Sequence, residues 1–173
     1  MFTRAANHFP QSPEAHYFVG VAARAGADYD LADREFRVSL MLQPDNVNAL
    51  AQLGFVLQER DKTVEAERTL RRALAINDKH FYANFDLGRL LVKSRRYEEA
   101  IPILRHAALL KPGNPGVHYQ LFITFSRLKS KAEADKELAI FKQLDEASKA
   151  QRQQGVEEED IEDNIAQPDF PRP

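Results

Sequence analysis

The hexapeptide ALAQLG at residues 49–54 ends in a glycine that recurs along the chain at a constant interval. Gly20, Gly54 and Gly88 define this interval, since 54 − 20 and 88 − 54 both equal 34, and we call it the repeat step. We call a set of positions that recur at the repeat step a column. A column of small residues contains Ala32, Ala66, Ala100 and Ala134, and a column of bulky residues contains Phe36, Leu70, Leu104 and Leu138. Several columns in phase at this period are typical of an array of helical repeats.

Each column has a physical role in a pair of packed helices. A glycine inside a helix costs about 1 kcal/mol of helix propensity relative to alanine, so its repetition indicates a site where two helices approach closely. The alanine column allows the same close approach, and the bulky column fills the space beside it. Because neither helix can bury its apolar stripe without the next unit, we expect an all-α fold, a right-handed superhelical solenoid of antiparallel helix pairs.

The boundaries of the units follow from this register. Proline cannot continue a helix, so Pro10, Pro44 and Pro112 should each end the second helix of a unit. The expected helix pairs are 13–26 with 30–43, 47–59 with 63–76, 81–93 with 97–110, and 115–128 with 131–153. These four units form an array over residues 13–154, with an extended last helix.

Residues 1–12 predict a truncated unit that has only its second helix. Phe2, Ala5 and Pro10 stand one repeat step ahead of the equivalent positions Phe36, Ser39 and Pro44. Without a first helix before it, this half-unit should expose an apolar strip that includes Phe9. The chain is therefore expected to be able to form homo-oligomers through this half-repeat.

Residues 155–173 form an acidic segment that we expect to be flexible. It contains seven acidic residues and one arginine, while the whole chain has a net charge of −2. Like charges and prolines disfavour packing. Two interpretations stay open, a solubilising tail and a ligand for the array itself, which would use the apolar side chains Ile161, Ile165 and Phe170.

Residues for catalysis, metal binding or a cofactor are not found in a usable pattern. No two of the five histidines stand three or four residues apart, as two metal ligands on one helix would. The repeated glycines never cluster into a phosphate-binding loop, and the chain has no cysteine. We therefore expect a protein that is not an enzyme and binds no metal and no cofactor.

Composition also limits the partners and the location. No apolar run is long enough to span a membrane, and the first ten residues lack the apolar core of a signal peptide. The array is only mildly basic and has no dense Lys/Arg stripe, which argues against nucleic acid as a partner. We expect a cytoplasmic location, unless an upstream export signal has been removed.

Three segments resemble the tetratricopeptide repeat family. Residues 49–54 are similar to the signature of its first helix, residues 97–101 (YEEAI) to that of its second helix, and residues 111–115 (KPGNP) to its turn between repeats. The resemblance covers residues 1 to about 150 and implies four such repeats plus the N-terminal half-unit. Phe122 replaces the fourth glycine of the column, so the fourth unit is the least typical, as a terminal cap would be.

The resemblance implies a concave groove lined by the first helix of each pair. Members of the family that clamp a terminal carboxylate use an asparagine column, but this column holds Val21, Phe55, Arg89 and Ile123 here, so we expect no such clamp. A peptide or protein segment with apolar anchors and negative charge suits the aromatic and cationic groove better. The candidate ligand-binding residues are Tyr17, Arg24, Asn48, Gln52, Phe55, Tyr82, Phe85, Asp86, Arg89, Lys93, Tyr119, Ile123 and Arg127.

The expected function is a protein-protein interaction scaffold that binds such a segment in its groove. Two alternatives stay open. The chain could be a structural segment that associates with its own copies, or the regulatory array of a larger protein. A plainer interpretation of the groove, in which aromatics only pack and basic residues are only solvated, stays open for single residues.

Overall fold

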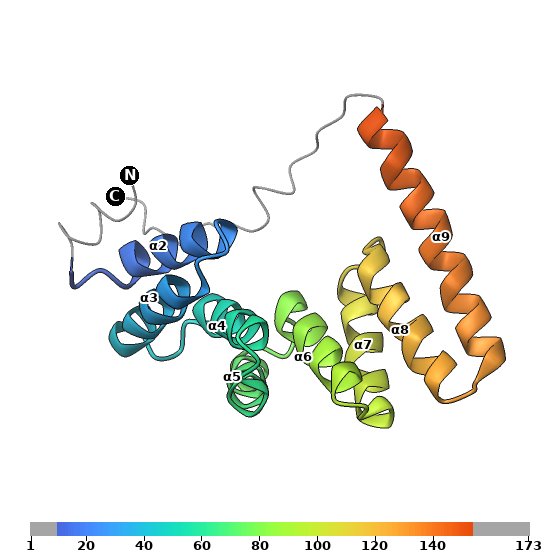
Figure 1. Ribbon diagram of the computed structural model, residues 1–173, viewed down its shortest axis with the longest axis horizontal. Coiled ribbons are helices and arrows are strands. Elements are labelled where there is room, and N and C mark those ends of the chain that lie inside the picture. The colour runs from blue at the N-terminus through green and yellow to red at the C-terminus, as the bar shows by residue number, and fades with distance from the viewer. Residues whose placement is uncertain (1–9, 154–173) are drawn as a thin grey trace.

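The computed structural model describes residues 10–153, and Figure 1 shows them as antiparallel helix pairs in a row. The pairs are α2 (Pro13–Ala25) with α3 (Tyr29–Leu42), α4 (Val47–Glu59) with α5 (Thr63–Ile76), α6 (Phe81–Lys93) with α7 (Tyr97–Leu110), and α8 (Pro115–Arg127) with α9 (Lys131–Gln153). Their ends lie within one residue of the expected ranges. The expected all-α solenoid is therefore confirmed, while the acidic segment and residues 1–9 of the half-unit lie outside the described residues.

The glycine column and the bulky column contact each other directly. A Cβ atom added at Gly20 would lie 2.7 Å from the Phe36 ring, and one added at Gly54 would lie 2.5 Å from the Leu70 side chain. At Gly88 the corresponding distance to a leucine of α7 is 2.4 Å. The alanines of the small column, from Ala32 to Ala134, are all buried. Each bulky side chain of a second helix thus fills the space that the glycine of the first helix leaves open.

The first helices of the pairs begin at equivalent polar residues. Each of these four residues accepts a hydrogen bond from the backbone N–H three positions later, over 3.0–3.3 Å. Such N-caps satisfy N–H groups that have no partner within the helix. They recur at the repeat step, at Ser12, Asn46, His80 and Asn114.

The turn inside each pair contains a residue with left-handed backbone, and in no pair is it a glycine. Ala27 has a φ of 59°, and the same position of the later pairs is left-handed at Asp61, Arg95 and Lys129. The next residue closes the turn, as Asp28 does by donating its N–H to the Ala23 carbonyl over 2.9 Å. This is the Schellman arrangement in which glycine is usual, so the chain is strained here at each repeat.

Replacing Ala27 with glycine should therefore raise the free energy of unfolding. Glycine removes the cost of a left-handed L-residue, which is about 1–2 kcal/mol. Its greater conformational freedom in the unfolded chain offsets about 0.5–1 kcal/mol of this stabilisation. We therefore expect the free energy of unfolding, measured in urea, to rise by about 0.5–1 kcal/mol. Ala25→Gly in the last turn of α2 is the matched control, and it should lose about 1 kcal/mol. Equal losses in both variants would contradict the strained turn.

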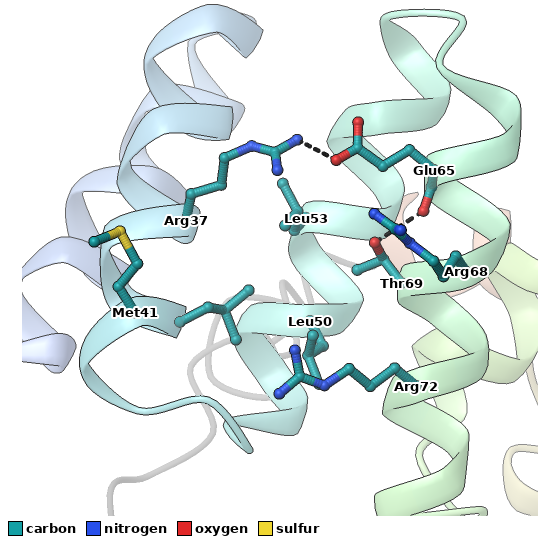
Figure 2. A pocket seen from close by; sticks show the side chains of 9 residues that line it. Arg37, Met41, Leu50, Leu53, Glu65, Arg68, Thr69 and Arg72 are labelled. Atoms are coloured by element: carbon teal, nitrogen blue, oxygen red, sulfur yellow. Dashed lines mark hydrogen bonds and ion pairs between the residues drawn. The ribbon is translucent and has the colours of Figure 1, made fainter.

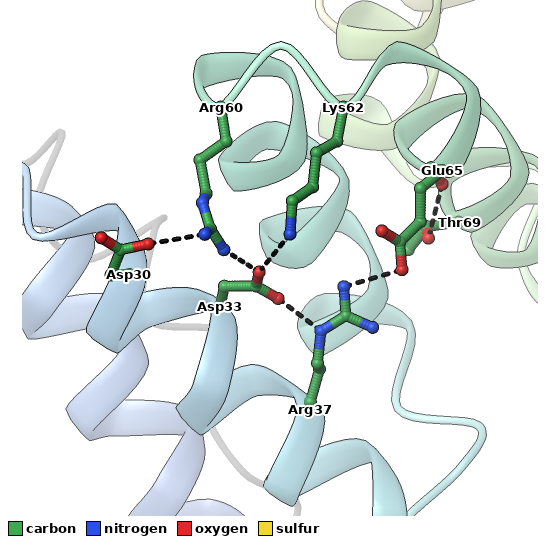
Figure 3. Close-up of polar contacts among 7 residues, drawn as sticks. All are labelled: Asp30, Asp33, Arg37, Arg60, Lys62, Glu65 and Thr69. Carbon is green, nitrogen blue, oxygen red and sulfur yellow. Dashed lines mark hydrogen bonds and ion pairs between the residues drawn. The ribbon is translucent and has the colours of Figure 1, made fainter.

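An ion-pair network joins the first pair to the second on one side of the array (Figure 3). Asp33 of α3 is buried and accepts from Arg37 over 2.5 Å, from Lys62 over 3.3 Å, and from Arg60. Arg37 also reaches Glu65 of α5 over 2.7 Å. Burial alone would raise the pKa of the Asp33 carboxyl, but the bonds from Arg37 and Lys62 together outweigh it and hold this pKa below its usual value.

Contacts between neighbouring pairs explain the curvature of the array. Among the described residues the backbones of the first helices lie close together, α2 with α4, α4 with α6 and α6 with α8, while the backbones of α3, α5, α7 and α9 do not approach one another in this way. The first helices are therefore crowded on the inner face and the second helices are spread on the outer face. We call these surfaces the inner face and the outer face.

Candidate functional site

Phe55 lies at the centre of the inner face, between two arginines from neighbouring helices. The guanidinium carbon of Arg24 on α2 is 5.1 Å from the centroid of the Phe55 ring. That of Arg89 on α6 is 5.9 Å from the same ring and 5.8 Å from the ring of Phe85. These distances allow cation–π attraction, so three helices together build an aromatic and cationic surface.

A small pocket of about 50 Å³ opens beside Phe55, and we call it the Gln52 pocket. It is lined by Arg24, Ala51, Gln52, Phe55, Tyr82 and Asp86. Gln52 is only 9% exposed, and its Oε1 atom is buried with no hydrogen-bond partner among residues 10–153. The Nε atom of Arg24 is likewise buried without a partner in this part of the chain. An acceptor and a donor without partners thus line one pocket, although buried polar groups are normally paired.

Asp86 is the buried carboxylate of this pocket, with 6% of its surface exposed. Burial raises the pKa of this carboxyl to about 7, although the charges of Arg89 and Arg24 oppose the rise. Arg89 Nη1 lies 3.5 Å from Asp86 Oδ1, and its Nη2 lies 3.7 Å from Glu59 Oε1. Asp86 can therefore gain or lose its charge near neutral pH, and this changes the charge of the pocket.

A larger hollow of about 530 Å³ lies where α6, α7 and α8 meet, and we call it the Arg127 pocket. Its cations are Lys93, Arg95 and Arg127, and the remaining lining residues are Val92, Tyr97 and Ile123. Lys93 is paired with Asp61 over 2.8 Å. The guanidinium groups of Arg95 and Arg127 form no hydrogen bond or ion pair with any described residue. This pocket can accept an anionic group without first breaking an internal ion pair of these two arginines.

Most of the predicted ligand-binding residues are thus brought together in two places. The Gln52 pocket with its rim holds Arg24, Gln52, Phe55, Tyr82, Phe85, Asp86 and Arg89, and the Arg127 pocket holds Lys93, Ile123 and Arg127.

Three predicted residues lie outside both pockets. Tyr17 is buried and packs on Phe36 with ring centroids 5.9 Å apart; burial raises its pKa, and an interaction with the Gln52 side chain opposes the rise. Asn48 Oδ1 accepts a hydrogen bond from His80 Nε2 over 2.9 Å at the start of α6. Tyr119 is 42% exposed, but its ring lies 5.2 Å from Phe141 of α9. For these three the structure provides an internal contact, and a role in binding stays a prediction.

Some residues beside the pockets were not predicted from the sequence. Arg95 and Tyr97 line the Arg127 pocket from a turn and from a second helix, whereas the sequence columns pointed only to first helices. Lys111 Nζ lies 5.3 Å from the rings of both Phe81 and Tyr82. Its position in the turn before α8 gave no signal of this stacking.

Two histidines, His16 and His118, link the two helices of their pairs. His16 Nδ1 is 2.7 Å from Glu35 and its Nε2 is 3.2 Å from the Pro10 carbonyl. His118, three repeats later, makes the same two contacts with Glu137 and Pro112 at the same distances. Within residues 10–153, no three His, Asp or Glu residues are placed to hold a metal ion.

The fold defines the class of the protein, a scaffold of stacked helical repeats. The family model described as tetratricopeptide repeat matches residues 57–121. Human tetratricopeptide repeat protein 7B is 26% identical over 117 residues, which are 68% of this chain and 14% of that protein. The chain thus spans about one seventh of the length of this relative.

Solved structures share the fold. MamA residues 41 to the end, from Desulfovibrio magneticus RS-1, has a TM-score of 0.70 at 24% identity, over 87% of this chain and 83% of that chain. YrrB, described as a TPR protein with an unusual peptide-binding site, has a TM-score of 0.69 at 21% identity, over 83% and 74% of the two chains. Residues 57–121 thus match the tetratricopeptide repeat family model, and the array as a whole resembles proteins of that family. Its described helices include none with the length and apolarity of a membrane span.

Proposed function

We propose that the inner face binds an extended segment of a partner protein, with apolar and acidic side chains. The observation that carries this proposal is the buried pair of Arg24 Nε and Gln52 Oε1, a donor and an acceptor without internal partners in one pocket. A main-chain peptide group has one acceptor and one donor, so it can satisfy both atoms. YrrB, a TPR protein with an unusual peptide-binding site, supports the same use of the fold.

The character of the ligand follows from the surroundings of this pair. Phe55 and Tyr82 offer apolar surface beside the Gln52 pocket, which favours an aliphatic or aromatic side chain next to the bound peptide group. Arg95 and Arg127 favour a carboxylate at the other pocket. The proposed ligand is therefore a segment that places an apolar residue and an acidic residue on the same side of an extended chain.

Binding to an array of short synthetic peptides of varied sequence tests this function. Peptides retained by the full chain should be enriched in acidic and apolar residues, and the double variant Arg89→Glu, Arg127→Glu should weaken their binding at least tenfold, because it replaces attraction with repulsion. Arg34→Glu is the control, because Arg34 is exposed on α3, away from the inner face. The control makes the same change from arginine to glutamate at one site. Retention that is equal in the double variant and the control would overturn groove binding.

Three alternatives to this function stay predictions. Self-association through the half-unit depends on residues 1–9 and occupation of the groove by the chain's own acidic segment depends on residues 155–173, both outside the described residues. The array could also regulate a larger protein, as the much greater length of the human relative illustrates. A cytoplasmic location and the absence of catalysis stay predictions of the same kind.

A further inference from the structure

A second hollow, of about 440 Å³, lies on the outer face between α3 and α5, and we call it the outer groove (Figure 2). Arg37 and Met41 project from α3 on one side, and Arg68, Thr69 and Arg72 project from α5 on the other. Because the backbones of α3 and α5 are not in close contact, the groove is open to α4 beneath them. It is separate from both pockets of the inner face and shares no lining residue with them.

The floor of the outer groove is apolar. Leu50 and Leu53 of α4 are buried at its base, and Leu40 of α3 is half-buried at its side. Met41 at the edge is 80% exposed, which is unusual for a large apolar side chain. A flexible methionine above an apolar floor can fold over an aliphatic side chain that enters the groove.

The rim of the outer groove has three arginines and one glutamate. Arg37 is held by Asp33 and by Glu65, the one carboxylate that lines the groove. Arg72 donates to the Pro44 carbonyl over 2.5 Å and has only the exposed Asp45 as an ion-pair partner among the described residues, at 3.4 Å.

Arg68 is different from the other two rim arginines. Its guanidinium group forms no hydrogen bond or ion pair with any residue of the described range 10–153. The rim therefore carries excess positive charge next to an apolar floor.

The next pair of outer helices does not repeat this combination. At the positions one repeat step later, Pro102 replaces Arg68, His106 replaces Arg72 and Asn84 replaces Leu50. The Asn84 amide is bound to the Asp78 and His80 carbonyls over 2.7 and 3.0 Å. The outer groove is thus a property of the first two pairs and is not a consequence of the repeat geometry alone.

We propose that the outer groove binds the acidic segment 157–165, EEEDIEDNI, of a neighbouring copy of this chain. Ile161 stands between Asp160 and Glu162, so an aliphatic side chain is flanked by carboxylates. The isoleucine enters the apolar floor, and the carboxylates pair with Arg68 and Arg72, the two rim arginines that Asp33 and Glu65 do not hold. Beside the Gln52 pocket, in contrast, Arg89 already faces Glu59 and Asp86.

The donor of the segment is a second molecule, because α9 and α3 lie at opposite ends of the array (Figure 1). A segment that follows α9 of one copy and binds between α3 and α5 of the next uses two different surfaces. Such a head-to-tail contact does not close on itself and gives assemblies that grow with concentration. It also weakens with added salt, since it depends on exposed charges.

Fluorescence anisotropy with the labelled synthetic peptide of residues 155–167 tests this proposal. The receptor is the full chain carrying Ile161→Ser and Ile165→Ser, so that its own segment does not compete. We expect saturable binding that weakens at least tenfold in Arg68→Glu. A Met41→Ser receptor should also bind less tightly, and circular dichroism of each variant verifies folding. Arg34→Glu occupies the same repeat position as Arg68 one unit earlier, and it should leave the affinity unchanged.

Each other outcome would overturn the proposal. Absence of binding at millimolar receptor would show that the segment is not a ligand. Equal weakening by Arg34→Glu and Arg68→Glu would show unspecific charge attraction. Loss of binding in Arg89→Glu or Arg127→Glu, with Arg68→Glu unaffected, would place the segment on the inner face, and this result would leave the proposed function of that face intact.

Discussion

Truncation of Leu70 to alanine is expected to lower the free energy of unfolding by about 2–5 kcal/mol, the range for a fully buried leucine. Leu70 has no exposed surface and lies against Gly54 of the preceding helix. The loss should appear as a lower midpoint in urea unfolding of the full chain, followed by circular dichroism. The variant removes one member of a packed pair, so its effect depends on what stands at position 54.

Gly54→Ala should change the sign of its effect when Leu70 is already truncated. In the parent chain the added methyl would lie 2.5 Å from the Cγ and Cδ2 atoms of Leu70, and we expect a net loss of about 1–2 kcal/mol from overpacking. In Leu70→Ala the space is free, and the better helix propensity of alanine should give a gain of about 1 kcal/mol.

The four-variant cycle of positions 54 and 70 measures this coupling directly. Gly113→Ala is the control, because a Cβ atom there would meet nothing within 4 Å. Additive effects at positions 54 and 70 would show that the glycine and bulky columns do not pack on each other, and the register of the array would be wrong.

The sequence predicted this register well because the packing of repeats uses residue size. A glycine must stand opposite Phe36 or Leu70, and the alternation of small and bulky columns at a constant repeat step is visible without coordinates. The helix ends follow from the same step. Local propensity alone would have been less reliable, since α7 continues through Pro102 in its interior.

Other features depend on contacts that no column shows. The left-handed turn residues, such as Ala27 and Arg95, are not glycines and gave no signal of their backbone conformation. Asp33 was not singled out, because its partners Arg60 and Lys62 are 27 and 29 residues away in the chain. The outer groove exists only because α3 and α5 spread apart around α4, and this is a property of the curvature.

The sequence predicted which face of the array carries the candidate site, but it did not predict how deeply the residues of that site are buried. The columns placed Gln52, Phe55, Asp86 and Arg89 on one surface, and the structure brings them together around Phe55. They could not show that Asp86 is nearly inaccessible or that Gln52 Oε1 and Arg24 Nε have no partners among the described residues. These details depend on how three helices meet, and they determine the chemistry of the pocket.

Asp86→Asn is expected to stabilise the chain at pH 8 by about 2–4 kcal/mol and to leave its stability at pH 4 nearly unchanged. The folded state raises the pKa of this carboxyl from 3.8 to about 7, so between these values the folded chain keeps a proton that the unfolded chain has released. Its contribution to stability is complete below pH 4 and is lost as the pH rises to about 7. With about 1.4 kcal/mol for each change of one in pKa, the loss is at most about 4 kcal/mol, and asparagine avoids it.

Urea unfolding at several pH values measures this difference, with Asp61→Asn as the control. Asp61 is exposed, and its hydrogen bond with Lys93 lowers its pKa, so the same substitution there should not stabilise the chain at pH 8. A loss of stability in Asp86→Asn at pH 8 would show instead that the carboxylate is a needed partner of Arg24 and Arg89.

The same titration should govern binding at the inner face. An ionised Asp86 repels an acidic ligand and attracts the side chains of Arg24 and Arg89 that the ligand needs, so affinity for acidic peptides should fall as the pH rises through 7. In Asp86→Asn the affinity should stay constant over this range, and Arg127→Glu should weaken binding at every pH without removing the dependence. Asp86 lowers the stability of the chain, and its charge changes in the pH range in which a ligand would bind. A role in ligand recognition therefore explains this buried carboxylate better than a role in packing does. A pH profile that is the same in the parent and in Asp86→Asn would separate Asp86 from binding.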